Sequence, residues 1–138
     1  MMIYVFDASF VGALIIPDEK NRAIDKIYAK IKNEEEKFAP QLFWYEIASI
    51  FRNVIRNKRF TFDEVLSFFP SLAALRLTSD FETGPGYSEK LLRLCNDYSL
   101  SSYDASYLEL AERKRAALCT LDDNLIIAAK KRGVTVME

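Results

Sequence analysis

Four acidic residues from separate parts of the chain are the best candidates for chemistry: Asp7, Glu46, Asp104 and Asp122. The 138 residues contain no histidine, which excludes Ser-His-Asp and Cys-His catalysis as well as histidine-ligated zinc. Clustered carboxylates raise one another's pKa unless a cation lies among them, and hard oxygen ligands suit Mg²⁺ or Mn²⁺. Such ions bind phosphate oxygens and activate water, so the chemistry indicated is hydrolysis of a phosphodiester.

Each of these acids also has a purely structural explanation. Asp7, Asp104 and Asp122 lie where helices are expected to begin, and aspartate is favoured as a helix cap or in the first turn. Ser101, three residues before Asp104, resembles half of a capping box. For any one aspartate taken alone, capping is the simpler interpretation.

The residues next to the acids bear on two questions: whether Glu46 binds a metal, and which of Asp122 and Asp123 is the ligand. The residues around Glu46 are mostly apolar, so its carboxylate is expected near buried surface, where an unpaired charge is costly. A salt bridge with Arg52 would be the alternative to a metal. Asp122 follows an expected strand directly, which favours it as the ligand and leaves the adjacent Asp123 as the cap.

The elements that would position these acids alternate along the chain. Strands are expected at 3–6, 37–39, 117–120 and 134–136, with 75–78 either a strand or a connector. Helices are expected at 8–16, from 18 or 19 to 32, at 41–57, at 61–75 with a division at Pro70, at 87–96 and at 124–131, besides the one that Ser101 opens. This alternation predicts an α/β fold with a mostly parallel sheet of about five strands and helices on both faces.

The acids fall at one edge of that sheet. Asp7 directly follows the first strand, and Asp122 follows the strand at 117–120. Asp104 opens the helix before that strand, and Glu46 lies early in the helix after the second. Ligand sites of open α/β sheets collect beyond the carboxyl ends of strands, near the point where strand order reverses. We therefore expect the four carboxylates to meet.

The overall composition is that of one folded domain spanning residues 1–138. Half of the residues are hydrophobic, and the net charge is -1, so any polyanion must be held by local patches or metal ions. Cys95 and Cys119 are expected to be free, buried thiols, which fits a reducing, cytoplasmic compartment. No basic leader is seen, and the apolar run 8–16 is too short to span a membrane.

The order of these motifs resembles the PIN domain, most closely the VapC-type toxins of type II toxin–antitoxin pairs. The matching segments are VFDASFVGALIIPDE, APQLFWYEIASIFRN, LSSYDASYLELAERK and ALCTLDDNLIIAAKKRGV. The resemblance implies a metal-dependent ribonuclease in which Asp7, Asp104 and Asp122 ligate Mg²⁺ directly or through water. It implies that Glu46 holds a metal-bound water or a second ion, with Ser9 and Thr120 as supporting residues. Ser49 departs from the asparagine that many members carry.

The resemblance also implies partners: an RNA substrate, a cognate antitoxin and a second copy of the chain in a homodimer. A phenylalanine cluster would form a docking surface or, alternatively, core: Phe60, Phe62, Phe68 and Phe69. Three basic clusters would contact phosphates or, equally, end helices as solvated residues: Arg52 with Arg56, Lys58 and Arg59, then Arg113–Arg115, then Lys130–Arg132.

The function expected from the sequence is therefore a Mg²⁺- or Mn²⁺-dependent endoribonuclease that hydrolyses structured RNA and acts as a toxin. The competing interpretation is a catalytically silent PIN-like module that binds RNA or protein. A third interpretation, a phosphatase of the haloacid dehalogenase type with Asp7 as nucleophile, requires a second aspartate where this chain has Ser9.

Overall fold

The computed structural model describes all 138 residues and contains a four-stranded sheet. The strands are β1 (Ile3–Phe6), β2 (Glu36–Pro40), β3 (Thr78–Asp80) and β4 (Ala117–Cys119), in the order β3-β2-β1-β4 with all neighbours parallel. Tyr4, Val5 and Phe6 are all buried, as expected for a strand at the centre of a sheet that is covered on both faces. The α/β class and the parallel sheet are confirmed.

The expectation of about five strands was wrong, because residues 134–136 make only a single bridge, between Leu118 and Val136. Leu118 N donates to Thr135 O at 2.8 Å, and Met137 N donates to Leu118 O at 2.9 Å. β4 is three residues long, and all three residues are in register with residues of β1. Along a strand the backbone N–H and C=O groups of alternate residues face opposite neighbouring strands. Only the middle residue therefore directs its backbone groups toward the C-terminal segment.

The helices largely match the expected segments, and the main exception is the position of the second helix. Pro17 opens a 3₁₀ turn, η1, so the next helix begins after Asn21, whose side chain accepts a hydrogen bond from Ile24 N at 2.9 Å. Pro70 does divide its segment. The helices are α1 (Ala8–Ile15), α2 (Arg22–Ala29), α3 (Leu42–Arg56), α4 (Phe62–Leu66), α5 (Phe69–Ala74), α6 (Pro85–Tyr98), α7 (Ser102–Lys114) and α8 (Asp123–Lys131), with η1 at Pro17–Glu19.

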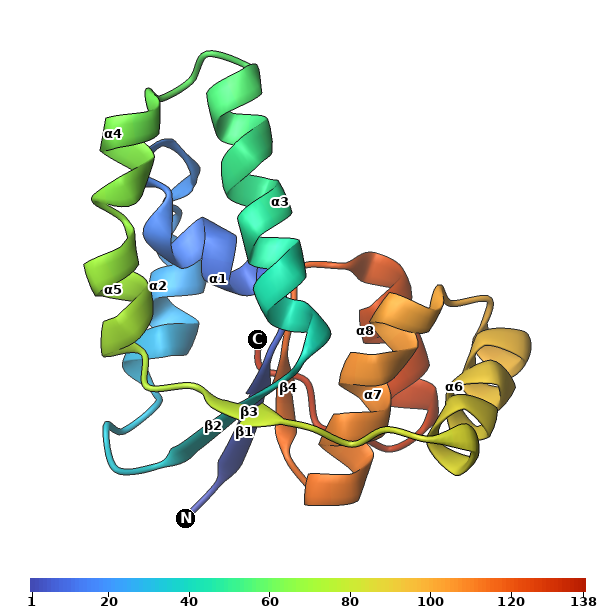
Figure 1. Cartoon of the computed structure of the whole chain (residues 1–138). Coiled ribbons are helices and arrows are strands. Elements are labelled where there is room, and N and C mark those ends of the chain that lie inside the picture. Colours follow the sequence, from blue (N-terminus) through green and yellow to red (C-terminus); the bar gives the residue numbers. More distant parts are fainter.

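The helices form two groups with the sheet between them: α1 to α5 lie on one side and α6 to α8 on the other (Figure 1). On the first side α1 packs against α3, and on the second α7 packs against β1 and β2. The fully buried side chains include Phe6, Phe10, Phe43 and Tyr107, with the Phe6 and Phe10 rings 5.0 Å apart in an edge-on contact. This core fixes α1, α3 and α7, which begin near the same edge of the sheet.

Two smaller expectations can be compared with the structure. Cys95 and Cys119 are both free, and Cys119 is buried while Cys95 is half-buried. None of the helices combines the length and the apolar character that a membrane crossing requires.

Candidate active site

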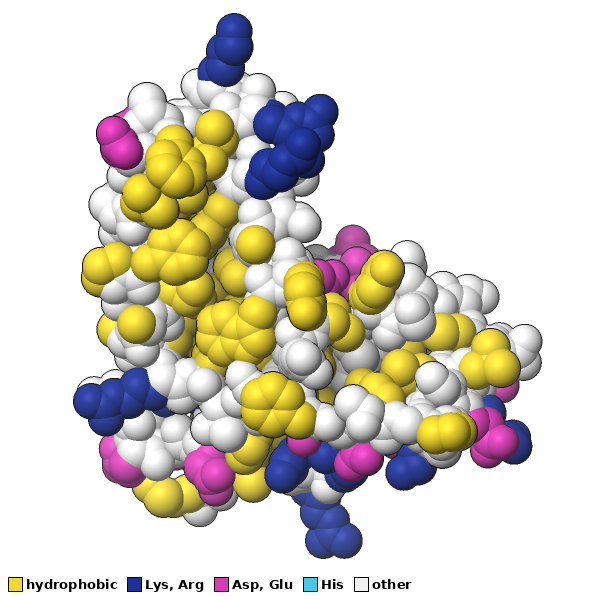
Figure 2. All heavy atoms as spheres, viewed as in Figure 1, with side chains coloured by type: hydrophobic (Ala, Val, Ile, Leu, Met, Phe, Trp, Pro, Cys, Tyr) yellow, Lys and Arg dark blue, Asp and Glu magenta, His cyan; other side chains and the backbone are white.

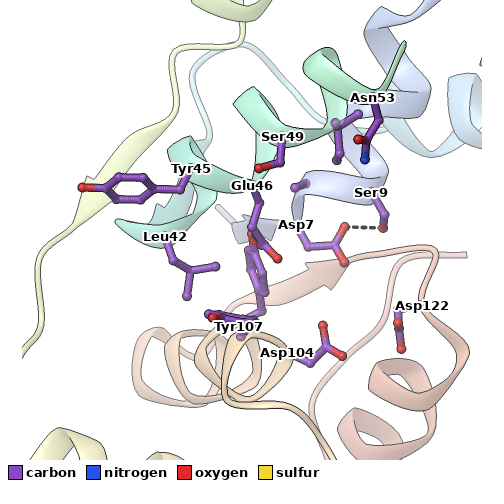
Figure 3. Close-up of a pocket in the computed structure, with 13 residues that line it drawn as sticks. Asp7, Ser9, Leu42, Tyr45, Glu46, Ser49, Asn53, Asp104, Tyr107 and Asp122 are labelled. Carbon is purple, nitrogen blue, oxygen red and sulfur yellow. Dashed lines mark hydrogen bonds between the residues drawn. The ribbon is translucent and has the colours of Figure 1, made fainter. Parts of the chain in front are cut away.

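The four acids predicted from the sequence line one cleft of about 630 Å³. Figure 3 shows Asp7 and Glu46 above Asp104 and Asp122, with the carboxylates directed toward a shared space. On the surface, acidic side chains lie in the notch between the α3 side and the α7 side of the molecule (Figure 2). The structure therefore brings the four acids together in one cleft.

The cleft lies at the point of the sheet where strand order reverses. The chain proceeds from β1 to β2 and β3 on one side and then returns to add β4 on the other side of β1. Phe6 is paired with Cys119, and Asp7 N donates to Cys119 O at 3.1 Å. The residues that follow β1 and β4 therefore leave the sheet side by side, as expected for a ligand site in this class of fold.

Asp7 is the most enclosed of the four acids, with 4% of its surface exposed. One carboxylate oxygen accepts hydrogen bonds from Ser9 Oγ at 2.7 Å and from Phe10 N at 2.9 Å, which caps α1, and the other accepts one from Thr120 Oγ1. Burial raises the pKa of Asp7 to about 6, against the lowering effect of these three hydrogen bonds. Ser9 and Thr120 thus hold the carboxylate in one orientation.

Glu46 is half-buried in α3 and forms no salt bridge with Arg52. Instead Tyr107 Oη, from α7, donates to Glu46 Oε1 at 2.5 Å. Burial raises the pKa of Glu46, the Tyr107 hydrogen bond lowers it, and the Asp104 charge raises it again. Tyr107 is 1% exposed, so a buried phenol fixes one oxygen of this carboxylate.

Asp104 lies in the first turn of α7, where its backbone N donates to Ser101 Oγ at 3.1 Å. No hydrogen bond from the Ser101 backbone to the Asp104 carboxylate completes a capping box. Burial raises the pKa of Asp104, as does the charge of Asp122. Capping alone therefore does not explain this carboxylate.

Asp122, and not Asp123, is the N-cap of α8, which corrects one expectation. Its Oδ1 accepts a hydrogen bond from Leu125 N at 2.8 Å, while its backbone N donates to Thr120 Oγ1 at 3.0 Å. Asp123 is the first residue of the helix, is exposed and does not line the cleft. α8 begins at Asp123, one residue earlier than expected, so the cap and the cleft residue are the same aspartate.

The donor chemistry of the cleft fits a divalent cation, although no three of these acids are gathered closely enough to surround one. All four side chains offer only oxygen, as Mg²⁺ and Mn²⁺ prefer. The charge of Glu46 raises the pKa of Asp7, in the same way that Asp104 acts on Glu46 and Asp122 on Asp104. Mg²⁺ commonly keeps several of its waters, so wider carboxylate spacing is compatible with binding through water.

Several residues of the cleft were not assigned to it from the sequence, although helical spacing carries the signal. Glu46, Ser49 and Asn53 lie three or four residues apart on α3, and Tyr107 lies three residues after Asp104 on α7. Once Glu46 and Asp104 are candidates, these positions share their helix faces. The cleft residues of this kind are Leu42, Tyr45, Ser49, Ile50, Asn53, Tyr103 and Tyr107.

The fold and the cleft can be compared with those of known protein families. The family model described as PIN domain matches residues 4–131. The chain therefore belongs to the PIN domain family. No curated protein matches the chain significantly in sequence.

Solved structures share the fold. PAE2754 from Pyrobaculum aerophilum is 25% identical, with a TM-score of 0.70 over 98% of this chain and 83% of that one. VapC20 from Mycobacterium tuberculosis, described as a toxin that cleaves the sarcin-ricin loop, is 14% identical, with a TM-score of 0.66 over 91% and 94%. A toxin-antitoxin complex from Klebsiella pneumoniae is 15% identical, with a TM-score of 0.61 over 86% of each chain.

Proposed function

We propose that this protein is a Mg²⁺- or Mn²⁺-dependent endoribonuclease that hydrolyses phosphodiester bonds in structured RNA. The observation that carries the proposal is the convergence of Asp7, Glu46, Asp104 and Asp122 on one cleft of a PIN domain. Because the chain contains no histidine, the carboxylates are the groups of the cleft that can accept a proton near neutral pH.

The hydrogen bonds of each carboxylate indicate whether it would hold the metal ion or accept a proton from water. A divalent ion, when bound, polarises the phosphate and lowers the pKa of attacking water. Asp7, Asp104 and Asp122 are the residues that would hold it, with Asp7 oriented by Ser9 and Thr120. Glu46 Oε1 is occupied by Tyr107, which leaves Oε2 to orient the water and accept its proton. The products implied by the family mechanism are a 5′-phosphate and a 3′-hydroxyl.

Cleavage of several structured RNAs by the purified protein, with Mg²⁺, with Mn²⁺ and with EDTA, tests this proposal. We expect metal-dependent cleavage that is abolished by Asp7→Asn and by Asp104→Asn, with circular dichroism showing that both variants remain folded. Asp123→Asn is the matched control, because Asp123 is an adjacent exposed carboxylate outside the cleft. Activity that survives in either cleft variant would refute the site assignment.

We further propose that the protein is the toxin of a toxin–antitoxin pair in the cytoplasm, with an antitoxin and a second copy of the chain as partners. The supporting observation is an apolar hollow of about 530 Å³ between α3 and α5, which includes Trp44, Ile47, Phe69 and Leu72. It continues the hydrophobic band that runs over α4 and α5 in Figure 2. Of the phenylalanine cluster, Phe62 and Phe69 are exposed whereas Phe68 is buried and Phe60 half-buried.

This partner surface can be tested in two steps. Light scattering after size exclusion gives the oligomeric state of the wild type and of Phe69→Glu, which places a charge in the apolar hollow. Growth arrest on expression, relieved by the product of an adjacent gene, tests the toxin assignment. A monomeric wild type or harmless expression would contradict the respective part.

The second candidate function is a catalytically silent PIN module that binds RNA or protein. The observation in its favour is that no three carboxylates lie close enough together to enclose an ion. Calorimetric titration with Mn²⁺ separates the two functions, because the nuclease requires binding that Asp104→Asn weakens. If the wild type binds no Mn²⁺, the silent module is the correct interpretation.

A further inference from the structure

A smaller pocket, separate from the acidic cleft, is lined by cations and by no acid. It has a volume of about 280 Å³, and its lining residues are Asn33, Lys37, Ala74 and Arg76. Asn33 lies in the loop before β2, Lys37 is the second residue of that strand, and Arg76 lies in the connection from α5 to β3. The polar groups of this pocket are therefore one ammonium, one guanidinium and one amide.

This basic pocket lies at the amino edge of the sheet, whereas the acids follow the carboxyl ends of the strands. Lys37 is in register with Tyr4 of β1, and Asp7 follows three residues later, a rise of about 10 Å along the strand. Arg76 likewise precedes β3. Figure 1 shows the chain entering β2 and β3 from the side of α2 and α5, away from the start of α7. The basic pocket is therefore not part of the acidic cleft.

Lys37 is a buried cation without an anionic partner. It is 5% exposed, and its hydrogen bond within the protein runs from Nζ to the main-chain oxygen of Glu35 at 3.3 Å. The Glu35 carboxylate instead accepts hydrogen bonds from Met2 N and Lys32 N, and Lys37 forms no ion pair with it. Lysine is almost never this buried unless it is paired, because an unpaired buried charge is costly. Two of the three donors of the ammonium therefore remain for a ligand.

The direction of the β2 side chains places Lys37 on the same side of the sheet as Arg76. Successive side chains of a strand point to opposite faces. Phe38, the next residue, faces α7, where Lys114 Nζ lies 4.7 Å from the centre of its ring. Lys37 therefore faces the side covered by α1 to α5. Arg76 is exposed and forms no ion pair, and the Asn33 side chain has no hydrogen-bond partner in the protein. All three polar side chains of the pocket can thus donate to a ligand.

Two cations without counter-charges, together with an amide, form a site for a compact dianion. Ammonium and guanidinium groups both bind phosphate. A phosphate group carries a charge of about −1.5 to −2 at pH 7 and offers three acceptor oxygens, so it neutralises both cations at once. A carboxylate carries a single charge and would leave one cation unpaired. The volume of about 280 Å³ is at the lower end of small-molecule sites, about 300 to 1,000 Å³, which suits a phosphate group.

We propose that Lys37, Arg76 and Asn33 bind a phosphate group at the amino edge of the sheet. The phosphate belongs either to a free ion or phosphomonoester or to an RNA strand that reaches this edge, and the chemistry of recognition is the same. The site does not depend on the proposed nuclease function, because none of its residues lines the acidic cleft. The bound anion neutralises the buried charge and joins the segments before β2 and β3, so it stabilises the folded protein.

Calorimetric titration of the whole chain with inorganic phosphate tests the site. The buffer contains no divalent metal, so that phosphate cannot bind through an ion in the acidic cleft, and is kept at constant ionic strength and about pH 8, where phosphate is a dianion. Sodium acetate is the comparison ligand. The test variants are Lys37→Met, which removes the charge and keeps an unbranched chain, and Arg76→Gln.

Two control variants match these substitutions. Lys114→Met removes a cation that contacts the opposite face of β2. Arg115→Gln removes an exposed arginine that follows a helix with the same left-handed backbone conformation as Arg76, at φ 53° against 54°. Neither residue lines the basic pocket.

We expect one phosphate ion to bind per chain, and acetate to bind far more weakly. Lys37→Met and Arg76→Gln should each weaken phosphate binding about tenfold or more, because each removes a charge-assisted hydrogen bond. The two controls should retain wild-type affinity. Phosphate should also raise the urea midpoint of the wild type and of the controls but not that of Lys37→Met. The same unfolding curves show whether Lys37→Met is folded.

A second measurement decides the source of the phosphate. Fluorescence anisotropy without divalent metal compares the binding of a short RNA oligonucleotide to Asp7→Asn and to the same protein with Arg76→Gln added. If RNA supplies the phosphate, Arg76→Gln lowers the RNA affinity and inorganic phosphate competes with the RNA. If a free phosphate is the ligand, neither effect occurs. Arg22→Gln, exposed on α2, is the control for this measurement.

Three results would overturn the phosphate site: no saturable binding of phosphate, equal binding of acetate, or wild-type phosphate affinity in either Lys37→Met or Arg76→Gln. None of them bears on the nuclease, because metal-dependent RNA cleavage is measured separately. Conversely, if no RNA is cleaved with either metal while phosphate binds as expected, the nuclease proposal fails and the phosphate site stands.

Discussion

Tyr107 and Glu46 are joined by a hydrogen bond across the cleft, although they lie 61 residues apart in the chain. Tyr107 belongs to α7 and packs in the core, where it is 1% exposed, whereas Glu46 belongs to α3 on the other side of the sheet. The hydroxyl donates to Oε1, and Oε2 accepts no hydrogen bond within the protein. The two helices that carry Glu46 and Asp104 are therefore fixed relative to each other at the site itself.

Removing that hydroxyl should affect activity more than folding. Tyr107→Phe keeps the buried ring, and water can replace the lost donor because Glu46 is only half-buried. We expect kcat to fall about tenfold, with a loss of about 1 kcal/mol in the free energy of unfolding. RNA cleavage assays and urea unfolding measure the two effects. Tyr28→Phe, which alters a half-buried ring on α2, is the control, and equal activity in both variants would contradict a positioning role.

Asparagine substitutions at the adjacent residues Asp122 and Asp123 separate a charge inside the cleft from one outside it. Asp122→Asn keeps an N-cap side chain, so stability should change by less than about 1 kcal/mol, but it removes a charge from the cleft. We expect cleavage to fall roughly a hundredfold or more, because several kcal/mol of charge stabilisation depend on a properly held ion. Asp123→Asn should retain activity. The reverse pattern would show that the cleft assignment is off by one residue.

Asp7 should make the stability of the metal-free protein depend on pH. Its pKa is about 6 in the folded state against an ordinary value of 3.8, so the folded protein binds this proton more tightly than the unfolded chain. This difference in pKa lowers the free energy of unfolding by about 3 kcal/mol above pH 6. The penalty disappears as pH falls toward 4, because Asp7 then becomes protonated in both states. Asp7→Asn, which resembles the protonated acid, should therefore be the more stable protein at pH 8 and about equal at pH 4.

Urea unfolding in EDTA at the two pH values tests this expectation. A gain in Asp7→Asn at pH 8 that vanishes at pH 4 is the expected pattern. An equal difference at both values would mean that the substitution acts through packing instead of through the charge.

The sequence was sufficient to locate the acids because each lies at an element boundary that a local pattern defines. The apolar run before Asp7, the proline before α3 and the serine before α7 are such patterns, and all four carboxylates reached one cleft. Local patterns do not report distances between elements. The Tyr107 hydrogen bond, and the pairing that occupies Arg113 while Arg52 stays free, depend on tertiary contacts between distant segments.

The three predictions that differ from the structure also concern contacts or boundaries that local patterns do not determine. The segment 134–136 has the residues of a strand, but a three-residue β4 offers it only Leu118 as a partner. The sequence pattern predicts a start of α2 that is too early, because Pro17 not only ends α1 but also occupies the first position of a 3₁₀ turn. Asp123 takes the place of Asp122 as the expected cap because the sequence pattern starts α8 at Asn124, one residue later than the structure does.

Metal binding should stabilise the protein at the same site. Mn²⁺ at about one hundred times its Kd adds about 2.7 kcal/mol to the free energy of unfolding when it binds only the folded state. We expect this gain in the wild type and in Asp123→Asn but not in Asp104→Asn, as measured by urea unfolding at pH 7. A full gain in Asp104→Asn would show that the ion binds elsewhere.

Arg113 links the sheet edge to the helix that carries Asp104. It forms two hydrogen bonds with Asp80 at the end of β3, at 3.0 and 2.7 Å, and bonds to Glu109 within α7 at 2.9 Å. Glu109 is 5% exposed, so removing its partner leaves a buried charge unpaired. Arg113→Met should cost about 3 to 5 kcal/mol, and adding Glu109→Gln should recover part of it. Arg132→Met, which breaks a more exposed pair with Glu112, should cost less than about 1 kcal/mol; equal losses in urea unfolding would contradict this ranking.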